Sequence, residues 1–211
     1  WQLGAVAVIK ANLNHEKIAN QLDEPMFISS KINLFNEIKK FPEKHNTKYK
    51  PNLSEEALLT FETGNGIKLS HYNLLVNANS IQKALNIKSR TKIYCNLEPN
   101  TSAWAVFKAI LPIYSGCIFD KDNPDLSINT KDGNYSLRYD FKNLKEFSNN
   151  DIAICPENTA AISVGPHPIH LTDFFLNKSN LKLKGHSVMM GYLDQQLNNL
   201  SFKKDGFFIY F

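Results

Sequence analysis

Residues 58–78 read LLTFETGNGIKLSHYNLLVNA, which is a short apolar run, a glycine-containing turn and a longer periodic segment. The apolar run at 57–61 is closed by a turn signal, and this predicts a buried β-strand. Beyond the turn, apolar residues recur with the spacing of one helix face: Leu74, Leu75, Ala78, Ile81, Ala84 and Leu85. Ser70 precedes them as an N-cap candidate, so the stretch predicts a strand, a turn and an amphipathic helix.

The same alternation continues toward the C-terminus. TKIYCN (91–96) predicts a second strand, SAWAVFKAILPIY (102–114) a mostly apolar helix, and GCIF (116–119) a third strand. Strands joined by helices of this length run parallel with right-handed crossovers, and ligands then bind at the carboxyl ends of the strands. The predicted fold class is therefore α/β, with parallel or mixed sheets flanked by helices.

The two flanks complete the predicted organisation. Upstream, three short elements are expected: a strand or helix-to-strand passage at 3–9, an amphipathic helix at 14–22 and a strand at 26–30. Residues 120–151 are polar, and we assign no element to them. Strand-like pieces divided by Asn, Gly and Asp follow near the C-terminus: FFL, LKLKG, SVMMGYL and GFFIYF. We therefore expect an α/β part at 1–165 and a smaller β subdomain at 166–211.

Composition excludes several classes of protein. With 211 residues, 43% of them hydrophobic and 21% charged, the chain is typical of a globular protein. It has no apolar run of about 18 residues and no signal-peptide pattern, so we expect a soluble, cytoplasmic protein without a transmembrane segment. Its three cysteines are widely spaced and show neither a disulfide framework nor a zinc pattern. The net charge of +4 is spread over single lysines, which argues against nucleic acid as a partner.

The turn at 61–71, FETGNGIKLSH, has the ingredients of an anion site. Backbone N–H groups of a glycine-containing loop and the positive end of a following helix attract phosphate, and Thr63 and Lys68 would add a hydroxyl and an ammonium. The spacing of Gly66, Lys68 and Ser70 nevertheless breaks the Walker pattern, and a third glycine for a dinucleotide fingerprint is missing. The residues alone leave two alternatives, a phosphate-binding loop or a plain left-handed turn.

The whole stretch 58–78 resembles the strand, Ser/Thr/Gly-rich loop and helix of the adenylate-forming, or AMP-binding, superfamily. This superfamily includes acyl-CoA synthetases, acyl-carrier-protein synthetases and the adenylation domains of peptide synthetases. Other stretches are similar to family segments in the same order: 3–22, AILPIYSGCIF (109–119), CPENTAAIS (155–163), LKLKGHSVMMGYLDQ (181–195) and KKDGFFIYF (203–211). The resemblance thus covers nearly the whole chain and implies the large N-terminal domain of such an enzyme.

The resemblance also implies roles for individual residues. Glu157 matches the glutamate that takes part in catalysis and helps to hold a magnesium ion. Nucleotide-binding residues are implied in the two loops: Thr63, Gly64, Asn65, Gly66, Lys68, Pro156, Asn158 and Thr159. Trp104 would contact the acyl group. Simpler interpretations stay open beside these: an exposed loop carboxylate for Glu157, a solvated charge for Lys68 and a core side chain for Trp104.

The function implied is ATP-dependent activation of a carboxylic acid, an acyl or fatty acid being favoured, as an acyl-adenylate with release of pyrophosphate. ATP and Mg²⁺ are the implied cofactors, and the thiol acceptor would belong to CoA or to the phosphopantetheine of an acyl carrier protein. Alternatives are an amino-acid adenylation domain and a non-catalytic pseudoenzyme of the same fold. An unrelated nucleotide-binding oxidoreductase is disfavoured, because Asn96 rather than an acidic residue ends the second strand.

The sequence departs from the family pattern at its ligand-contacting loops. The loop after Thr63 is short and lacks the Pro-Lys pair, and the Tyr-Gly-Thr that should precede Glu157 is absent. The sequence also stops at Phe211, before the Thr-Gly-Asp whose aspartate would hold the ribose. Two interpretations follow: segments of the natural protein are missing from this sequence at these junctions, or the chain is a degenerate relative that has lost its nucleotide loops.

Overall fold

The computed structural model describes residues 7–10, 26–29 and 51–210. The chain divides into two compact units, residues 1–50 and 51–211. In the first unit, β1 (Ala7–Lys10) pairs in parallel with β2 (Met26–Ser29). These strands agree with the ones predicted around 3–9 and 26–30, whereas the helix predicted at 14–22 lies outside the described residues.

The second unit opens with a hairpin where we predicted a turn leading straight into a helix. β3 (Glu56–Thr60) pairs antiparallel with β4 (Ile67–Ser70), and β14 (Gly191–Tyr192) pairs antiparallel with the other edge of β4. We expected the strand at 57–61 to run parallel to the strand at 91–96, but β3 lies in a different sheet and pairs with β4. The short loop between β3 and β4 cannot hold a crossover helix, so this pair is antiparallel. β4 was missed because it is only four residues long and lies directly before the helix.

The predicted amphipathic helix is confirmed as α3 (His71–Ala84), with Ser70 as its N-cap. The Ser70 hydroxyl accepts the backbone N–H of Asn73 at 3.1 Å, and Asn73 Oδ1 accepts the N–H of Ser70 at 3.0 Å. This reciprocal capping satisfies two N–H groups that a helix start would otherwise leave unpaired. Leu74, Ala78, Ile81 and Leu85 are buried as predicted, but Leu75 and Ala84 are exposed.

The second predicted helix spans residues 102–115 and is irregular in its middle. α4 (Ser102–Trp104), a π-helical turn (Ala105–Ile110) and α5 (Leu111–Ser115) follow one another without a break. Pro112 has no N–H and its ring would collide with a carbonyl of the preceding turn of a regular α-helix, so the wider π turn accommodates it.

This helix connects two parallel strands, as predicted. β5 (Lys92–Cys95) lies between β6 (Ile118–Phe119) and β7 (Leu126–Ile128) and runs parallel to both. β7 comes from the polar stretch to which we assigned no element. The parallel arrangement predicted for the whole α/β part is therefore confirmed for this sheet.

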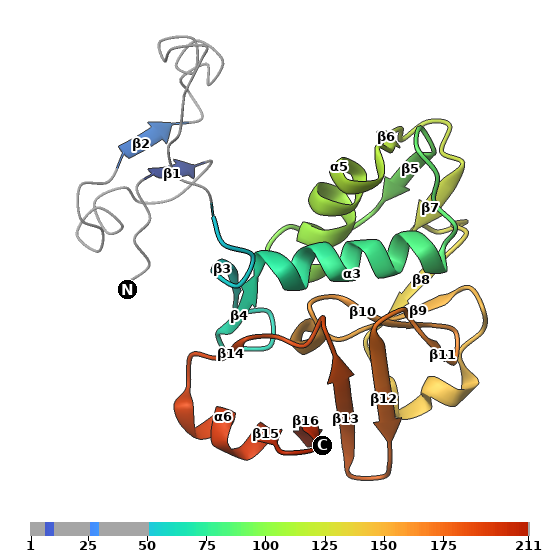
Figure 1. Cartoon of the computed structure of the whole chain (residues 1–211). Coiled ribbons are helices and arrows are strands. Elements are labelled where there is room, and N and C mark those ends of the chain that lie inside the picture. The colour runs from blue at the N-terminus through green and yellow to red at the C-terminus, as the bar shows by residue number, and fades with distance from the viewer. Residues whose placement is uncertain (1–6, 11–25, 30–50, 211) are drawn as a thin grey trace. The chain divides into compact units, whose positions relative to one another are not determined.

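A mixed sheet lies below α3 in Figure 1, in the order β11-β10-β9-β8. Its strands are β8 (Ser136–Arg138), β9 (Asp151–Ile154), β10 (Ala161–Val164) and β11 (His167–Pro168). Two short 3₁₀ helices flank it, at Phe141–Glu146 and Pro156–Asn158. Every residue of β9 is buried, so this strand is part of the core.

The C-terminal residues form strands, as we predicted, and these strands pair antiparallel. The sheet has the order β12-β13-β16-β15 and is built from β12 (Thr172–Leu176), β13 (Asn180–Gly185), β15 (Phe202–Lys203) and β16 (Gly206–Tyr210). A short helix that we did not predict, α6 (Gln195–Ser201), precedes β15. The subdomain boundary at 165/166 stays a prediction.

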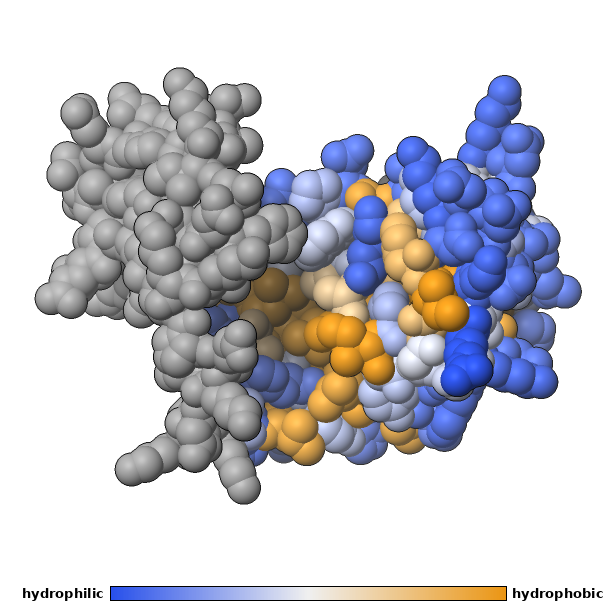
Figure 2. Space-filling view, turned by 90° about the horizontal axis from the view of Figure 1, so that it is seen from above, coloured by the Kyte–Doolittle hydropathy of each residue, from blue (hydrophilic) through white to orange (hydrophobic). Residues whose placement is uncertain are grey.

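The core of the second unit is built around α3, which contacts both the 102–115 helix and β10 (Figure 1). One continuous cluster of buried apolar residues runs from Ile67 to Phe207 and joins the layers. Seen from above, apolar residues are visible in the middle of the described surface, and hydrophilic ones predominate toward the right (Figure 2). Among the described residues, no helix is long and apolar enough to cross a membrane. The arrangement is the mixed α/β fold predicted.

Candidate functional site

The loop between β3 and β4 is a tight hairpin turn. Thr63, Gly64 and Asn65 are exposed, and the Gly64 N–H donates to the carbonyl of Phe61 at 2.9 Å. Gly64 has a φ of +82°, a conformation that glycine adopts readily. The turn does not lead directly into α3 as predicted, because β4 intervenes and the helix start is already capped by Ser70. The backbone N–H groups of the turn and the helix N-terminus are therefore separate.

Gly66 and Lys68 lie on the β4 side of this turn. Gly66 is buried, and its carbonyl accepts the N–H of Leu193 at 2.7 Å. Lys68 stands in the strand opposite Leu59, half-buried, and its carbonyl accepts the N–H of Met190. The nucleotide-binding role of both residues stays a prediction.

Glu157 is a buried carboxylate, only 7% exposed, so the alternative of an exposed loop carboxylate is wrong. Its Oε1 accepts a hydrogen bond from the hydroxyl of Tyr192 at 3.2 Å, and its Oε2 accepts one from the thiol of Cys155 at 3.4 Å. Burial, together with the nearby negative charge of Glu157, raises the pKa of both Tyr192 and Cys155. Both groups therefore stay protonated at neutral pH and remain donors.

The neighbours of Glu157 fasten this segment to the rest of the fold. Asn158 and Thr159 are fully buried, and Pro156 starts the short 3₁₀ helix. The carbonyl of Asn158 accepts Asn77 Nδ2 of α3 at 3.1 Å, and Thr159 Oγ1 donates to the carbonyl of Ser187 at 2.6 Å. These side chains hold the segment in place, and their predicted contact with a nucleotide or acyl group is not tested.

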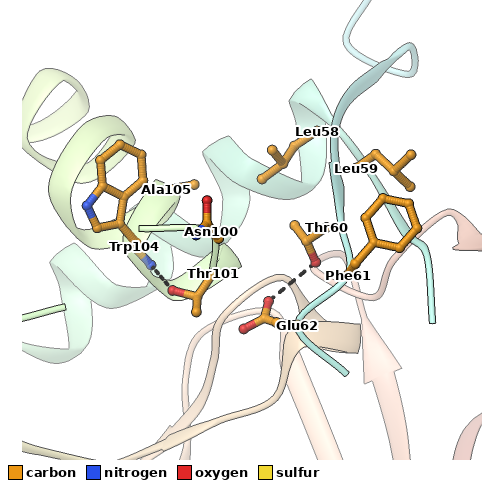
Figure 3. Close-up of a pocket in the computed structure, with 9 residues that line it drawn as sticks. All are labelled: Leu58, Leu59, Thr60, Phe61, Glu62, Asn100, Thr101, Trp104 and Ala105. Carbon is orange, nitrogen blue, oxygen red and sulfur yellow. Dashed lines mark hydrogen bonds between the residues drawn. The ribbon is translucent and has the colours of Figure 1, made fainter. Parts of the chain in front are cut away.

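A cavity of about 500 Å³ opens between β3 and the start of the 102–115 helix. Figure 3 shows side chains of β3 on one side of it and Trp104 on the other. Its lining residues are Leu58, Leu59, Thr60, Phe61, Glu62, Asn100, Thr101, Trp104 and Ala105. Trp104 is half-buried and lines this cavity, and its contact with an acyl group stays a prediction.

Glu62 is a residue of this cavity that we did not single out from the sequence. Its Oε1 accepts the backbone N–H of Ser102 at 2.8 Å and lies 3.4 Å from the hydroxyl of Thr60. No sequence signal singles it out, because the cavity forms between β3 and the 102–115 helix, which are distant in the sequence.

No protein-family model matches this sequence, and no curated protein matches it. Solved structures do match in fold. McyG A-PCP complexed with phenylalanyl-adenylate gives a TM-score of 0.68 at 15% identity, over 92% of this chain and 44% of that chain. ATP-bound MatB from Rhodopseudomonas palustris gives 0.69 at 13% identity, over 97% and 55%. A long-chain-fatty-acid-CoA ligase from Archaeoglobus fulgidus gives 0.66 at 14% identity, over 98% and 59%.

The chain has the fold of the adenylate-forming enzymes. It spans about half the length of the three structures, so the match concerns only part of each of them. Within residues 51–210, the hairpin, α3 and the Glu157 segment, all of them in stretches that we matched to family segments, contribute to one core. The fold predicted from those stretches is thus confirmed.

A Mg²⁺ ion, if bound in this fold, would be held by the carboxylate of Glu157. Magnesium is usually held by one or two carboxylates together with substrate phosphates. Both oxygens of Glu157 already accept hydrogen bonds. Among the described residues, no group of three or more His, Cys, Asp or Glu could hold a metal ion. A carboxylate has about four lone-pair sites, so these hydrogen bonds leave acceptor capacity on both oxygens, and the role of Glu157 as a metal ligand stays a prediction.

Proposed function

We propose that this protein activates a carboxylic acid with ATP, forming an acyl-adenylate that is then passed to a thiol. The single observation that supports this most is the extent of the fold match, which covers more than nine-tenths of the chain in structures with bound ATP or an adenylate. The acceptor would be CoA or the phosphopantetheine of a carrier protein. An acyl or fatty acid is favoured as substrate, with an amino acid as the alternative, and a cytoplasmic location stays a prediction.

In this reaction the main contribution of the protein is to position the two substrates. A carboxylate oxygen attacks the α-phosphorus of ATP, a new P–O bond forms, and the bond to the β-phosphate oxygen breaks as pyrophosphate leaves. The cavity beside Trp104 would hold the acyl part, and rigid placement of this kind contributes much of the rate enhancement in such reactions. A magnesium ion, when bound, neutralises phosphate charge.

A non-catalytic relative of the same fold is the second candidate, and one observation favours it. The buried carboxylate of Glu157 accepts hydrogen bonds from Tyr192 and Cys155, as a structural group would. Such a protein would keep the fold without turnover.

The test is ATP–pyrophosphate exchange by the full chain with a panel of fatty, aryl and amino acids. We expect exchange that depends on one class of acid, and a fall of about 100-fold in Glu157→Gln, because this change disturbs a positioned segment. Glu98→Gln, at an exposed site, is the matched control and should exchange normally. Silence across the panel, with no detectable ATP binding, would identify the non-catalytic relative.

A further inference from the structure

The turn between β3 and β4 carries the only Asn-Gly pair in the chain, Asn65 followed by Gly66. Asn65 is exposed, and its side-chain amide has no hydrogen-bond partner among the described residues. Asparagine is a chemically unstable residue, and a glycine after it increases the instability, because glycine has no side chain to shield its backbone nitrogen. The electrophilic carbon of such a reaction, Cγ of Asn65, is thus open to water and to the neighbouring backbone.

The backbone nitrogen of Gly66 is available as the nucleophile. The Gly66 carbonyl accepts the N–H of Leu193 at 2.7 Å, but the Gly66 N–H donates to no group within residues 51–210. The regular pairing of the hairpin begins one residue later, at Ile67 opposite Thr60. A hydrogen bond would hold the N–H in place and would have to break before the nitrogen could attack, and this obstacle is absent here.

Packing against Leu193 explains why a glycine follows Asn65. A Cβ placed on Gly66 would lie 2.4 Å from Cδ1 of Leu193 and 2.6 Å from its Cγ, which is closer than carbon atoms approach without a bond. A larger residue at position 66 would therefore displace the side chain of Leu193, while the backbone of Leu193 is bonded to the Gly66 carbonyl. The fold favours glycine at this position and so preserves the reactive pair.

We propose that Asn65 is a site of spontaneous deamidation in the folded protein. The backbone nitrogen of Gly66 loses its proton to water and attacks Cγ of Asn65. A new C–N bond closes a succinimide ring, the bond between Cγ and the amide nitrogen breaks, and that nitrogen takes up a proton and leaves as ammonia. Water then opens the ring at either of its carbonyls and gives aspartate or isoaspartate. Water is the only co-reactant, and no group is oxidised or reduced.

The reaction changes the charge of the turn from neutral to negative at one position. The turn belongs to the loop in which we predicted nucleotide-binding residues, Thr63 and Lys68 among them. A carboxylate at position 65 would repel the phosphates of ATP. We therefore expect deamidation to weaken ATP binding, and this consequence, unlike the deamidation itself, rests on the proposed function.

The test is incubation of the full chain in mildly alkaline buffer made with oxygen-18 water, followed by digestion in ordinary water and mass spectrometry. Asn79, followed by Ser80, is an internal control, because it lies within α3 and its amide donates to the Tyr114 hydroxyl at 2.7 Å. We expect Asn65 to gain the label at least about tenfold faster than Asn79, a ratio that corresponds to about 1.4 kcal/mol in activation free energy. Equal rates at the two positions, or no label at Asn65, would overturn the proposal.

Asn65→Gln is the matched variant, because it keeps an exposed amide but would have to close a less favourable six-membered ring. It should gain no label at position 65 over the same period. Labelling of this variant as fast as that of the natural chain would show that the amide is hydrolysed directly, and the proposed attack by Gly66 would be wrong.

Calorimetric titration with ATP, before and after the incubation, separates this inference from the proposed function. The natural chain should lose affinity for ATP on incubation, whereas Asn65→Gln should keep the affinity of its own fresh sample. Labelling of Asn65 without any change in ATP binding would support the deamidation site and remove the turn from the nucleotide site. ATP binding by a chain that gains no label would support the proposed function and overturn this inference.

Discussion

At the scale of the residue, the most informative group is the carboxylate of Glu157. The resemblance of CPENTAAIS to a family motif pointed to this position, but its environment could not be predicted from the sequence. Tyr192 lies far along the chain, and it reaches Glu157 only because β14 pairs with the edge of β4. Glu62 was missed for a similar reason, since its cavity forms between two segments that are distant in the sequence.

Replacing Tyr192 by phenylalanine should destabilise the protein. The change removes the hydroxyl that donates to Glu157 and leaves a buried carboxylate oxygen unpaired, which costs about 1–3 kcal/mol in the free energy of unfolding. Urea denaturation measures this. Tyr210→Phe, at a position that is 57% exposed, is the control, and equal stability of the two variants would contradict the hydrogen bond.

Asp151 should make stability depend on pH in the acid range. Burial alone would raise its pKa, but hydrogen bonds from Arg138 and Ser148 outweigh burial and lower it below the model-compound value of 3.8. Because the folded-state pKa is the lower one, the contribution of the carboxylate is present above the unfolded pKa. It is lost as the pH falls through the folded value.

The expected consequence concerns Asp151→Asn. At neutral pH the free energy of unfolding of this variant should be about 1–3 kcal/mol lower than that of the natural protein, and the difference should shrink as the pH falls below the ordinary aspartate pKa of about 3.9. Asp132→Asn, at an exposed carboxyl, should show neither effect. Chemical denaturation at a series of pH values makes the comparison, and a gap that persists in strong acid would exclude the charge as its cause.

At the scale of the element, local patterns predicted helices better than strand pairing. The apolar spacing after Ser70 predicted α3 correctly, because a helix is decided by neighbours three and four residues apart. The β3–β4 hairpin depends on pairing between two strands, which local patterns do not reveal. The four residues IKLS are too few to be recognised as a strand from the sequence. The π turn before Pro112 could not be predicted either, because a proline in a helical pattern indicates an irregularity but not its type.

Gly185 at the end of β13 provides a test of element geometry. Its φ is +138°, and a Cβ placed there would lie 2.2 Å from the backbone carbonyl oxygen of Leu171. Gly185→Ala should therefore lose about 2–4 kcal/mol in the free energy of unfolding.

Gly64→Ala is the matched control for Gly185→Ala. Gly64 also has a positive φ, but no atom lies within 4 Å of a Cβ placed there, so this change should cost only about 1–2 kcal/mol. Thermal or urea unfolding of the two variants gives the comparison. A cost for Gly64→Ala as large as that for Gly185→Ala would show that steric overlap is not the cause.

At the scale of the whole molecule, matched stretches in the correct order predicted the fold, although no single stretch was decisive. The order of segments survives sequence divergence because each segment packs on one shared core, here built around α3. The β3–β4 turn carries less of this packing, since Thr63, Gly64 and Asn65 are exposed, and it departs from the family pattern. This is why the fold could be predicted with more detail than the site.

The central claim is that a carboxylate oxygen of the substrate attacks the α-phosphorus of ATP. The most direct measurement supplies the full chain with ATP and carboxylic acids labelled with oxygen-18 in the carboxyl group, and then analyses the nucleotide product by mass spectrometry. If the account is correct, AMP carries a labelled oxygen, because the adenylate transfers one carboxylate oxygen to phosphorus when its acyl bond is cleaved. AMP without label, or ADP as the only nucleotide product, would contradict it.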